Sequence, residues 1–354
     1  MGDYFYNYGG KLTPTYYRVE NESYVFSNNA TLTQGRGNII FGKQEVMGNY
    51  NFIIEGTTTG TDCFLDCRNY SGTNNNCVAF GNLNASKGNY NYLFGIYHNW
   101  WDKTGTVENA VMFGEGNLVN SNHCFVEGKY CLKDTNAEYA HIVGNGTDRD
   151  NRSNAYTLDW QGNGTFAGTV SSSTGADYAE YFEWKDGNPN NEDRVGYIVT
   201  LDGNKIVKAN TGDDVLGICS GTAMVLGDSA EWNWSKRYLT DDFGRIIYED
   251  YDVEHEEIKD EETGKVIEEA WTEHIHAPKT NPEYDASQPY VKRADRPEWQ
   301  IVGMMGKIYV RDDGTCVVNG YADVKDGIAT KASGKTNMRV MERVTDNIVR
   351  VLMK

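Results

Sequence analysis

Short apolar segments that end in glycine recur through the first 150 residues of the chain. Several of them follow one another at the same interval, from Gly81 to Gly95 and from Gly114 to Gly128. A fixed short period indicates a β-solenoid or β-roll in which each repeat forms one coil. The full series is Asn38–Gly42, Phe52–Gly56, Cys63–Cys67 (with cysteine in place of glycine), Cys77–Gly81, Asn91–Gly95, Ala110–Gly114, Cys124–Gly128 and Ala140–Gly144.

The residue two places before the glycine is apolar in every segment, which predicts an inner ladder of the roll. The next position back is also apolar in all segments except the one with His141. A strand that is apolar on both faces needs a second core. We expect the same roll from other subunits to supply this core, in a homotrimer around one axis. The predicted inner ladder is Ile40, Ile54, Leu65, Ala79, Leu93, Met112, Val126 and Ile142.

After the roll the pattern stops repeating but remains one of short strands and turns, so an all-β chain is expected. A connector is predicted first, with two strands around a turn at Gln161–Gly164. The last stretch, with its many valines and isoleucines, favours strands over a helix. The expected elements are two strands within 152–170, strands at 300–310 and 315–318 around a turn at 311–314, and a terminal hairpin of 339–344 and 348–353.

A strongly acidic stretch lies at residues 249–273, with twelve carboxylates against two lysines in a chain of net charge −18. Its apolar residues, between Val253 and Trp271, flank a turn at Glu262–Gly264, which predicts a projecting two-stranded arm. A solvated loop is the alternative. In a trimer, three such arms would repel one another, so assembly would respond to salt or divalent cations.

The balance of 33 Lys and Arg against 51 Asp and Glu argues against nucleic-acid binding, because phosphate contacts need cations. No run of 18 apolar residues is present to span a membrane, and Met1–Tyr8 lacks the features of a signal peptide. We therefore expect that the protein is made in a cytoplasm and does not leave by that route. The seven cysteines form no CxxC pair, so buried reduced thiols are expected rather than a metal site, and no cofactor is predicted.

One interval in the roll, from Gly95 to Gly114, is longer than the regular coil and contains an inserted loop. Tyr97, Trp100 and Trp101 lie in this loop and could stack on sugar rings of a bacterial cell-surface receptor. The alternative is that a tryptophan folds back and covers the roll. His98, beside them, is expected to be a loop residue rather than a catalyst.

The 14-residue coil resembles the left-handed β-roll heads of trimeric autotransporter adhesins over residues 24–147. The connector resembles the segment that precedes terminal domains in phage tail proteins. These resemblances imply a trimeric left-handed parallel β-roll followed by a mixed, mostly-β domain with a projecting hairpin arm. The expected divisions are an attachment segment at 1–23, the roll at 24–150, the connector at 151–170 and a terminal domain at 171–354.

The terminal domain resembles the intramolecular-chaperone autoproteolytic cleavage domain of phage neck-appendage and tail-spike proteins, the G2 peptidase family. This resemblance implies a tail fibre or appendage of the virion that contacts other tail proteins and whose terminal domain drives trimer assembly. The segments that carry it are Asp177–Pro189, Asp193–Gly196, Leu201–Ile206, Gly217–Ser220, Asp242–Gly244, Asn281–Asp285, Arg296–Trp299, Gly303–Lys307, Val310–Cys316 and Gly327–Thr330.

The family cuts its own backbone before the aspartate of this motif and requires the glutamate three residues later. Carried over, the scissile bond is Ala176–Asp177 and the assisting acid is Glu180. Asp177 could protonate its own leaving nitrogen, and Glu180 could act from a turn or from another subunit. Tyr178, Phe182 and Trp184 would shield the glutamate and raise its pKa. Family members can carry serine where Ala176 stands, and alanine cannot form an ester, so either Asp177 does the work or cleavage is slow.

Two other functions are open at this point. The chain could be a trimeric adhesin with a permanent, uncut cap, in which Asp177 and Glu180 are structural. It could also be a polysaccharide depolymerase, for which Glu55, Asp66 and Glu127 are the candidate acids. No other enzyme motif is present. His274 and His276, which flank one isoleucine, are a weak candidate for metal binding.

Overall fold

The computed structural model divides the chain into two compact units, Met1–Val170 and Ser171–Lys354. Each unit is built from strands, and the described residues contain no α-helix and only one 3-10 turn, η1 (Arg293–Asp295). The all-β fold class is thereby confirmed. The structure describes residues 18–20, 23–25, 31–34, 36, 38–40, 45–47, 51–58, 63–72, 76–86, 88–99, 107–119, 121–231, 234–259 and 263–354.

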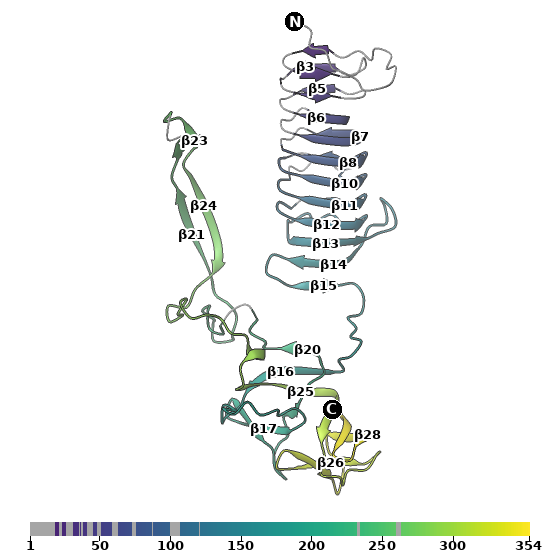
Figure 1. Ribbon diagram of the computed structural model, residues 1–354, viewed down its shortest axis with the longest axis vertical. Coiled ribbons are helices and arrows are strands. Elements are labelled where there is room, and N and C mark those ends of the chain that lie inside the picture. The colour runs from purple at the N-terminus through teal and green to yellow at the C-terminus, as the bar shows by residue number, and fades with distance from the viewer. Residues whose placement is uncertain are drawn as a thin grey trace, which may run out of the picture. The chain divides into compact units, whose positions relative to one another are not determined.

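The first unit is a parallel β-solenoid whose strands stack coil upon coil (Figure 1). Phe64 pairs with Val78 and Val78 with Tyr92, so these coils repeat at the predicted interval. Tyr92 then pairs with Val111, which confirms that the next coil contains the inserted loop. The stacked strands are β1 (Arg18–Glu20), β2 (Ser23–Val25), β3 (Thr31–Gln34), β4 (Ile39–Ile40), β5 (Glu45–Met47), β6 (Phe52–Thr58), β7 (Phe64–Gly72), β8 (Val78–Asn82), β9 (Ala85–Ser86), β10 (Tyr92–Ile96), β11 (Val111–Glu115), β12 (Phe125–Lys129) and β13 (Tyr139–Asn145).

The inner ladder is buried as predicted, with one correction at β6. Ile53 is fully buried there and pairs with Ile40 and Leu65, whereas the count from the glycine had placed Ile54 on the ladder. A register shift follows between Ile53 and Glu55, so the count from the glycine is off by one residue in this coil. The side chain of Ile54 lies outside the described residues. The other predicted members are buried: Ile40, Leu65, Ala79, Leu93, Met112, Val126 and Ile142.

Asparagine side chains close the coils at buried corners. The Asn84 amide donates to the carbonyls of Phe80 and Gly95, and its oxygen accepts from the His98 backbone. Asn117 makes the same contacts one coil later, to Phe113, Gly128 and Cys131.

Cysteines occupy equivalent corner positions. The Cys77 sulfur accepts from the Asn91 backbone, as Asn51 Oδ1 does from the Cys63 backbone. Cys63, Cys77, Cys124 and Cys131 also belong to the apolar core of the solenoid, and burial raises the pKa of the Cys131 thiol to about 11. Cys219 and Cys316 are buried in the second unit.

Glycines end the strands because neighbouring coils approach too closely for any side chain. Gly114 has a φ of +108°, and a Cβ atom there would lie 1.9 Å from the Gly128 carbonyl oxygen. Gly81 and Gly95 also have positive φ values, and each lies against the carbonyl oxygen of the equivalent glycine in the next coil. The glycine period is therefore a steric requirement of coil stacking.

An antiparallel hairpin follows the solenoid, as the connector sequence predicted. Its strands are β14 (Asn154–Asp159), which pairs with β13, and β15 (Gly164–Phe166). Phe166 stacks against Tyr156 across the hairpin, with ring centroids 4.8 Å apart.

The second unit is organised by the long strand β25 (Trp299–Arg311), which pairs with β16, β19 and β29. Its main core gathers Ile198, Ile308, Val310, Val340 and Val351. The other strands of this sheet are β16 (Asp177–Glu183), β17 (Ile198–Asp202), β18 (Lys205–Lys208), β19 (Gly217–Cys219), β20 (Ala223–Gly227), β26 (Tyr321–Lys325), β27 (Ile328–Lys331), β28 (Met338–Thr345) and β29 (Ile348–Met353).

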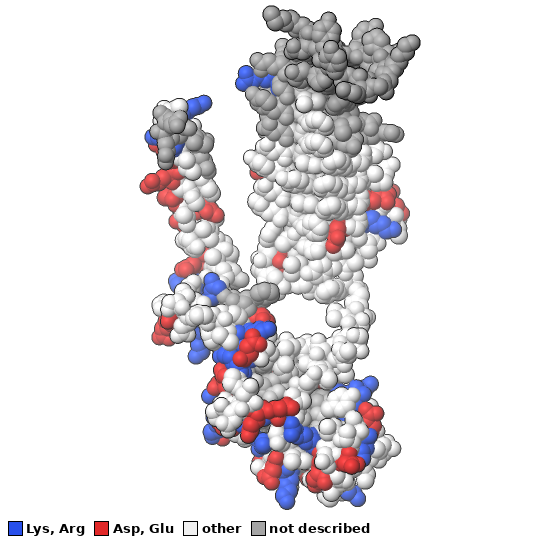
Figure 2. All heavy atoms as spheres, viewed as in Figure 1, with Lys and Arg blue, Asp and Glu red and all other residues white. Residues whose placement is uncertain are grey.

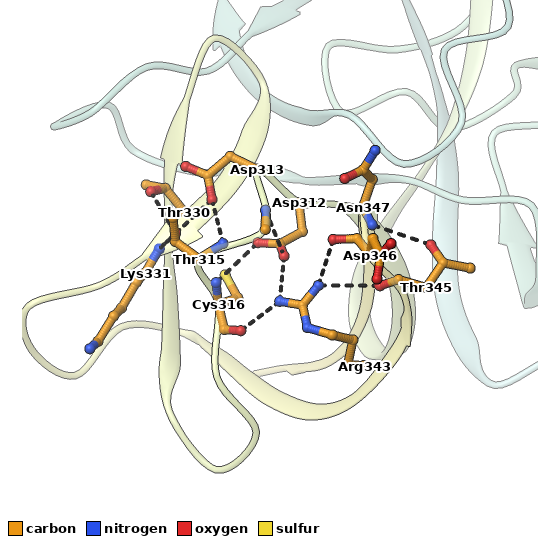
Figure 3. Close-up of polar contacts among 11 residues, drawn as sticks. Asp312, Asp313, Thr315, Cys316, Thr330, Lys331, Arg343, Thr345, Asp346 and Asn347 are labelled. Carbon is orange, nitrogen blue, oxygen red and sulfur yellow. Dashed lines mark hydrogen bonds and ion pairs between the residues drawn. The ribbon is translucent and has the colours of Figure 1, made fainter.

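The terminal hairpin is confirmed, but the strand predicted at 315–318 is absent. Asp312 accepts hydrogen bonds from the backbone of Gly314 and Cys316, and Arg343 donates to both Asp312 and the Cys316 carbonyl (Figure 3). These side chains take the backbone groups that a strand would use, so the segment folds as irregular turns.

The acidic arm is confirmed as a projecting hairpin and is longer than predicted (Figure 1). It consists of β21 (Tyr248–His255) with β24 (Trp271–Pro278), and β22 (Ile258–Lys259) with β23 (Val266–Glu268) near its tip. Figure 2 shows acidic side chains along it, whereas the described face of the solenoid carries few charges.

Candidate functional site

Strand β16 places Asp177 at its first position, between β20 on one side and β25 on the other. Its side chains alternate between buried and more exposed, as a strand covered on one face requires. Asp177, Ala179 and Tyr181 face the buried side, while Tyr178 and Glu180 face the other. Asp177 is only 3% exposed.

Both neighbouring strands carry a β-bulge opposite the start of β16. Asp177 pairs with Ala223 and Tyr178 with Val225, so β20 contains one extra residue there. On β25 a register shift likewise falls between the partners of Tyr178 and Ala179. Bulges re-aim side chains and interrupt pairing, and they are over-represented beside active sites.

The peptide bond between Ala176 and Asp177 is held by backbone contacts on both sides. The Ala176 amide donates to the Thr222 carbonyl at 3.1 Å, and the Ala176 carbonyl accepts from the Lys307 amide at 3.4 Å. Gly306, with a φ of +119°, leaves room for this carbonyl, because a Cβ atom there would lie 2.5 Å from its oxygen. The carbonyl therefore has a fixed position with one backbone donor beside it.

The Asp177 carboxyl is buried and incompletely satisfied. Its Oδ1 accepts from the Thr222 hydroxyl at 3.2 Å, while Oδ2 has no hydrogen-bond partner among the described residues. Burial raises the pKa of Asp177, and hydrogen bonds from Ser220 and Thr222 oppose this rise. Gly303 lies against Oδ2, since a Cβ atom there would be 2.5 Å from that oxygen. The carboxyl directly after the peptide bond is thus one whose charged form burial disfavours.

Glu180 lies on the opposite face of β16 from Asp177. It accepts a hydrogen bond from the Tyr178 hydroxyl and lies across Gly227 of β20. The expectation that Glu180 reaches the bond from a turn is wrong, because the segment is a strand and positions three apart point to opposite faces. Within one chain, the structure does not bring the two predicted acids together.

Sequence reasoning did not assign the hydroxyls of Ser220 and Thr222, or the glycines Gly303 and Gly306, to this site. The segments Gly217–Ser220 and Gly303–Lys307 were available as signals, since both belong to the motif set of the resembled family. These residues come close to Asp177 only because strands that lie far apart in the chain pair with one another.

Arg194 holds the segment that follows β16. Arg194 is 7% exposed, forms two hydrogen bonds with Asp186 at 2.8 and 2.7 Å, and lies over the Trp184 ring at 4.5 Å. The Arg194 guanidinium lowers the pKa of Asp186 to about 2. This pair holds the residues after β16 against the second core, which contains Trp184.

The predicted receptor-binding loop is largely outside the described residues. Trp100 and Trp101 fall there, whereas Tyr97 lies at the beginning of the loop and donates from its backbone to the Asn82 carbonyl. His98 is buried in the asparagine ladder, not exposed in the loop, and burial lowers its pKa to about 4.

The other candidate acids and histidines form no catalytic or metal constellation in the described residues. Glu127 contacts His141 at 3.4 Å, and the side chains of Glu55 and Asp66 lie outside the described residues. His274 and His276 pair with Asp252 and Asp250 across the arm. Over the described ranges, no three or more His, Cys, Asp or Glu side chains are grouped to hold a metal ion. The same ranges contain no helix long and apolar enough to cross a membrane.

The chain is similar in sequence to a known protein family. Residues 123–349 match the family described as Peptidase_G2, IMC autoproteolytic cleavage domain. The match begins well before residue 171, where the resemblance was expected to start, so it includes the last coils of the solenoid and the β14–β15 hairpin.

Two curated relatives are similar over part of the chain. A phage-related protein of Bacillus subtilis strain 168, YobO, is 43% identical over 175 residues, which cover 49% of this chain and 19% of that protein. The pre-neck appendage protein of Bacillus phage B103 is 40% identical over 157 residues, or 44% of this chain and 16% of that protein. The chain thus spans less than a fifth of the length of these relatives.

A solved structure shares the fold. The crystal structure of the pre-mature bacteriophage phi29 gene product 12 aligns with a TM-score of 0.59 at 22% identity. The alignment covers 95% of this chain and 38% of that one, so the similarity extends over both units.

Proposed function

This chain belongs to the Peptidase_G2, IMC autoproteolytic cleavage domain family, and we propose that it is a homotrimeric phage appendage or tail-fibre protein that cuts itself once. It is homologous to phage pre-neck appendage proteins. That homology supports a place in the virion, in contact with other virion proteins. We further propose contact with a glycan on the bacterial surface. The second unit drives trimer assembly and then severs the bond between Ala176 and Asp177.

The outer face of the solenoid supports the homotrimer. A continuous series of rings runs along this face, with centroids 4.8 to 5.9 Å apart. Tyr92 and Phe113 are 41% and 42% exposed in the single chain. An aromatic surface of this extent is typical of an interface, and two further copies around an axis would cover it. The rings belong to Phe52, Phe64, Phe80, Phe94, Phe113, Phe125, His141, Tyr156 and Phe166.

The observation that carries self-cleavage is the buried Asp177 carboxyl, with its unpartnered Oδ2, directly after the peptide bond. In its protonated form, Asp177 donates a proton to its own amide nitrogen as the bond to Ala176 breaks. Water adds to the Ala176 carbonyl carbon, and the Lys307 amide donates to the developing oxyanion. One water is consumed, and the products are a carboxylate at Ala176 and an amine at Asp177.

Glu180 of a neighbouring subunit acts as the base for the attacking water. Its own chain holds it on the face of β16 away from Asp177, while a second copy could present it to the bond. This requirement makes cleavage dependent on assembly, because a monomer lacks one of the two acids. The chain then cuts itself only after the trimer has formed.

The deciding experiment is the intact mass of the purified protein under denaturing conditions, beside Asp177→Asn. Two fragments divided between residues 176 and 177, absent from the variant, establish self-cleavage. A single species in both proteins overturns it and leaves the second unit as a permanent trimer cap. Light scattering on both proteins tests the trimer separately, and a monomer would overturn that part.

A further inference from the structure

A polar pocket of about 440 Å³ lies in the first unit, where the β14–β15 hairpin meets the chain before β13. The two segments are in register there, because Tyr139 pairs with Asp159. The volume falls in the range of small-molecule sites. The pocket is lined by Asn136, Ala137, Glu138, Tyr139, Asp159, Trp160, Gln161, Asn163 and Thr165.

The hairpin turn holds the backbone next to Trp160. Asp159 Oδ1 accepts from the backbone of Gln161 and Asn163, and its Oδ2 accepts from the Asn163 amide at 2.8 Å. These bonds lower the pKa of Asp159 and use both of its oxygens. Asp159 therefore shapes the turn, and the adjacent indole is left 50% exposed.

The opposite wall is also built by side-chain hydrogen bonds. Asp134 accepts from the backbone of Glu138 and Tyr139 and from the Ser121 hydroxyl. Asn136 donates to Glu138 Oε1 at 2.9 Å, which orients that carboxylate. An exposed aromatic ring thus shares a pocket with carboxylate and amide groups.

This combination fits a sugar. The face of an indole attracts the C–H bonds of a pyranose ring, while amides and carboxylates match its hydroxyls. Trp160 and Gln161 are both exposed, so their side chains are accessible to a ligand. No lysine or arginine lines the pocket, and Glu138 and Asp159 are acidic, so an anionic polymer is disfavoured.

We propose that this pocket binds one or two residues of an uncharged saccharide, stacked on Trp160 and hydrogen-bonded by Glu138 and Gln161. The site is separate from the loop that begins at Tyr97. Its biological meaning rests on the proposed attachment to a bacterial surface glycan. Sugar binding itself requires neither cleavage at Ala176–Asp177 nor an identified host.

The test titrates glucose, galactose, N-acetylglucosamine and their disaccharides into the full chain, followed by saturation-transfer NMR and calorimetry. Glucuronic acid and N-acetylneuraminic acid serve as anionic comparators. At least one uncharged sugar should bind, and Trp160→Ala should weaken it by roughly tenfold. Trp160→Phe should retain most of the binding, because it preserves an aromatic face.

Trp271→Ala is the matched control, since Trp271 is 46% exposed on the acidic arm and outside the pocket. It should bind sugar like the wild type. The proposal is overturned if no uncharged sugar binds, if only the acids bind, or if Trp160→Ala binds as well as wild type. A change in oligomer mass for Trp160→Ala would also overturn it, by making Trp160 a subunit contact. Loss of sugar binding with intact cleavage separates this site from the proposed autoproteolysis.

Discussion

Asp177 and Glu180 occupy one strand but face opposite sides of its sheet. Asp177 is buried against Thr222, and Glu180 is half-exposed beside the Tyr178 hydroxyl. The two acids on which the proposed cleavage depends are therefore separated within each chain. Under that proposal a second copy supplies the glutamate, which makes cleavage depend on assembly.

Mixed oligomers test this separation. Asp177→Asn and Glu180→Gln should each lose cleavage by roughly 100-fold or more when alone. When the two chains are co-expressed, about half of the Glu180→Gln chains should be cut, because a neighbour then supplies the glutamate. Intact mass resolves the two chains. Uncut Glu180→Gln chains in the mixture would show that the glutamate acts within its own subunit.

The pH dependence of stability should reveal the buried Asp177. Its pKa is raised above the ordinary value of 3.8, so the native state holds this proton more tightly than the unfolded state. The stability it contributes is fully present below pH 3.8 and is lost as the pH rises through the native pKa. The free energy of unfolding, measured with denaturant at several pH values, should not show this pH-dependent loss in Asp177→Asn. An identical slope in both proteins would contradict a neutral buried carboxyl.

Gly303→Ala should displace the Asp177 carboxyl without straining the backbone. The new methyl group would lie 2.5 Å from Asp177 Oδ2, and a small misplacement can slow a reaction by roughly 100-fold. Cleavage is followed by intact mass over time. Gly334→Ala, with no atom within 4 Å of the added Cβ, is the control and should cut normally. Normal cleavage in Gly303→Ala would argue against this position for the carboxyl.

Gly114→Ala should disrupt the solenoid. Its methyl group would lie 1.9 Å from the Gly128 carbonyl oxygen, so adjacent coils must separate at a cost of about 3 kcal/mol or more. Gly162→Ala also has a positive φ but no neighbour within 4 Å. It therefore measures the cost of backbone strain without a steric clash. Thermal unfolding should show a large loss of stability for Gly114→Ala and a small loss for Gly162→Ala. Equal losses would attribute the glycine period to backbone conformation alone.

The Asp186–Arg194 pair should contribute to the loss of stability of the second unit at low pH. The native pKa of Asp186 is about 2, below the unfolded value of 3.8. Its stabilisation is therefore present above pH 3.8 and is lost as the pH falls towards 2. Asp186→Asn should cost about 1 kcal/mol at neutral pH, because Arg194 loses its charged partner Asp186, which is 57% exposed and screened by solvent, but keeps the contact with Glu192 at 3.0 Å. Asp202→Asn, which removes the exposed partner of Lys185, should cost less, as denaturant unfolding can show.

The predictable parts of the fold were those governed by local periodicity. The inner ladder, the hairpin β28–β29 and the arm followed from alternation and turns, because each depends on neighbours in sequence. The errors arose where side chains or bulges intervened. Ile53 pairs with Leu65 at the place predicted for Ile54, because a register shift separates it from the glycine. Asp312 and Arg343 bond the backbone groups of the strand that was expected at 315–318.

The sequence by itself determined the repeat, the all-β class, the family resemblance and the positions of Asp177 and Glu180. It could do so because a regular period and ordered motifs are local properties of the chain. The tertiary structure decided which groups surround the bond between Ala176 and Asp177 and which face each acid occupies. Thr222, Gly303, Gly306 and Lys307 reach that bond only through the pairing of β16 with β20 and β25, a long-range contact that no local pattern specifies.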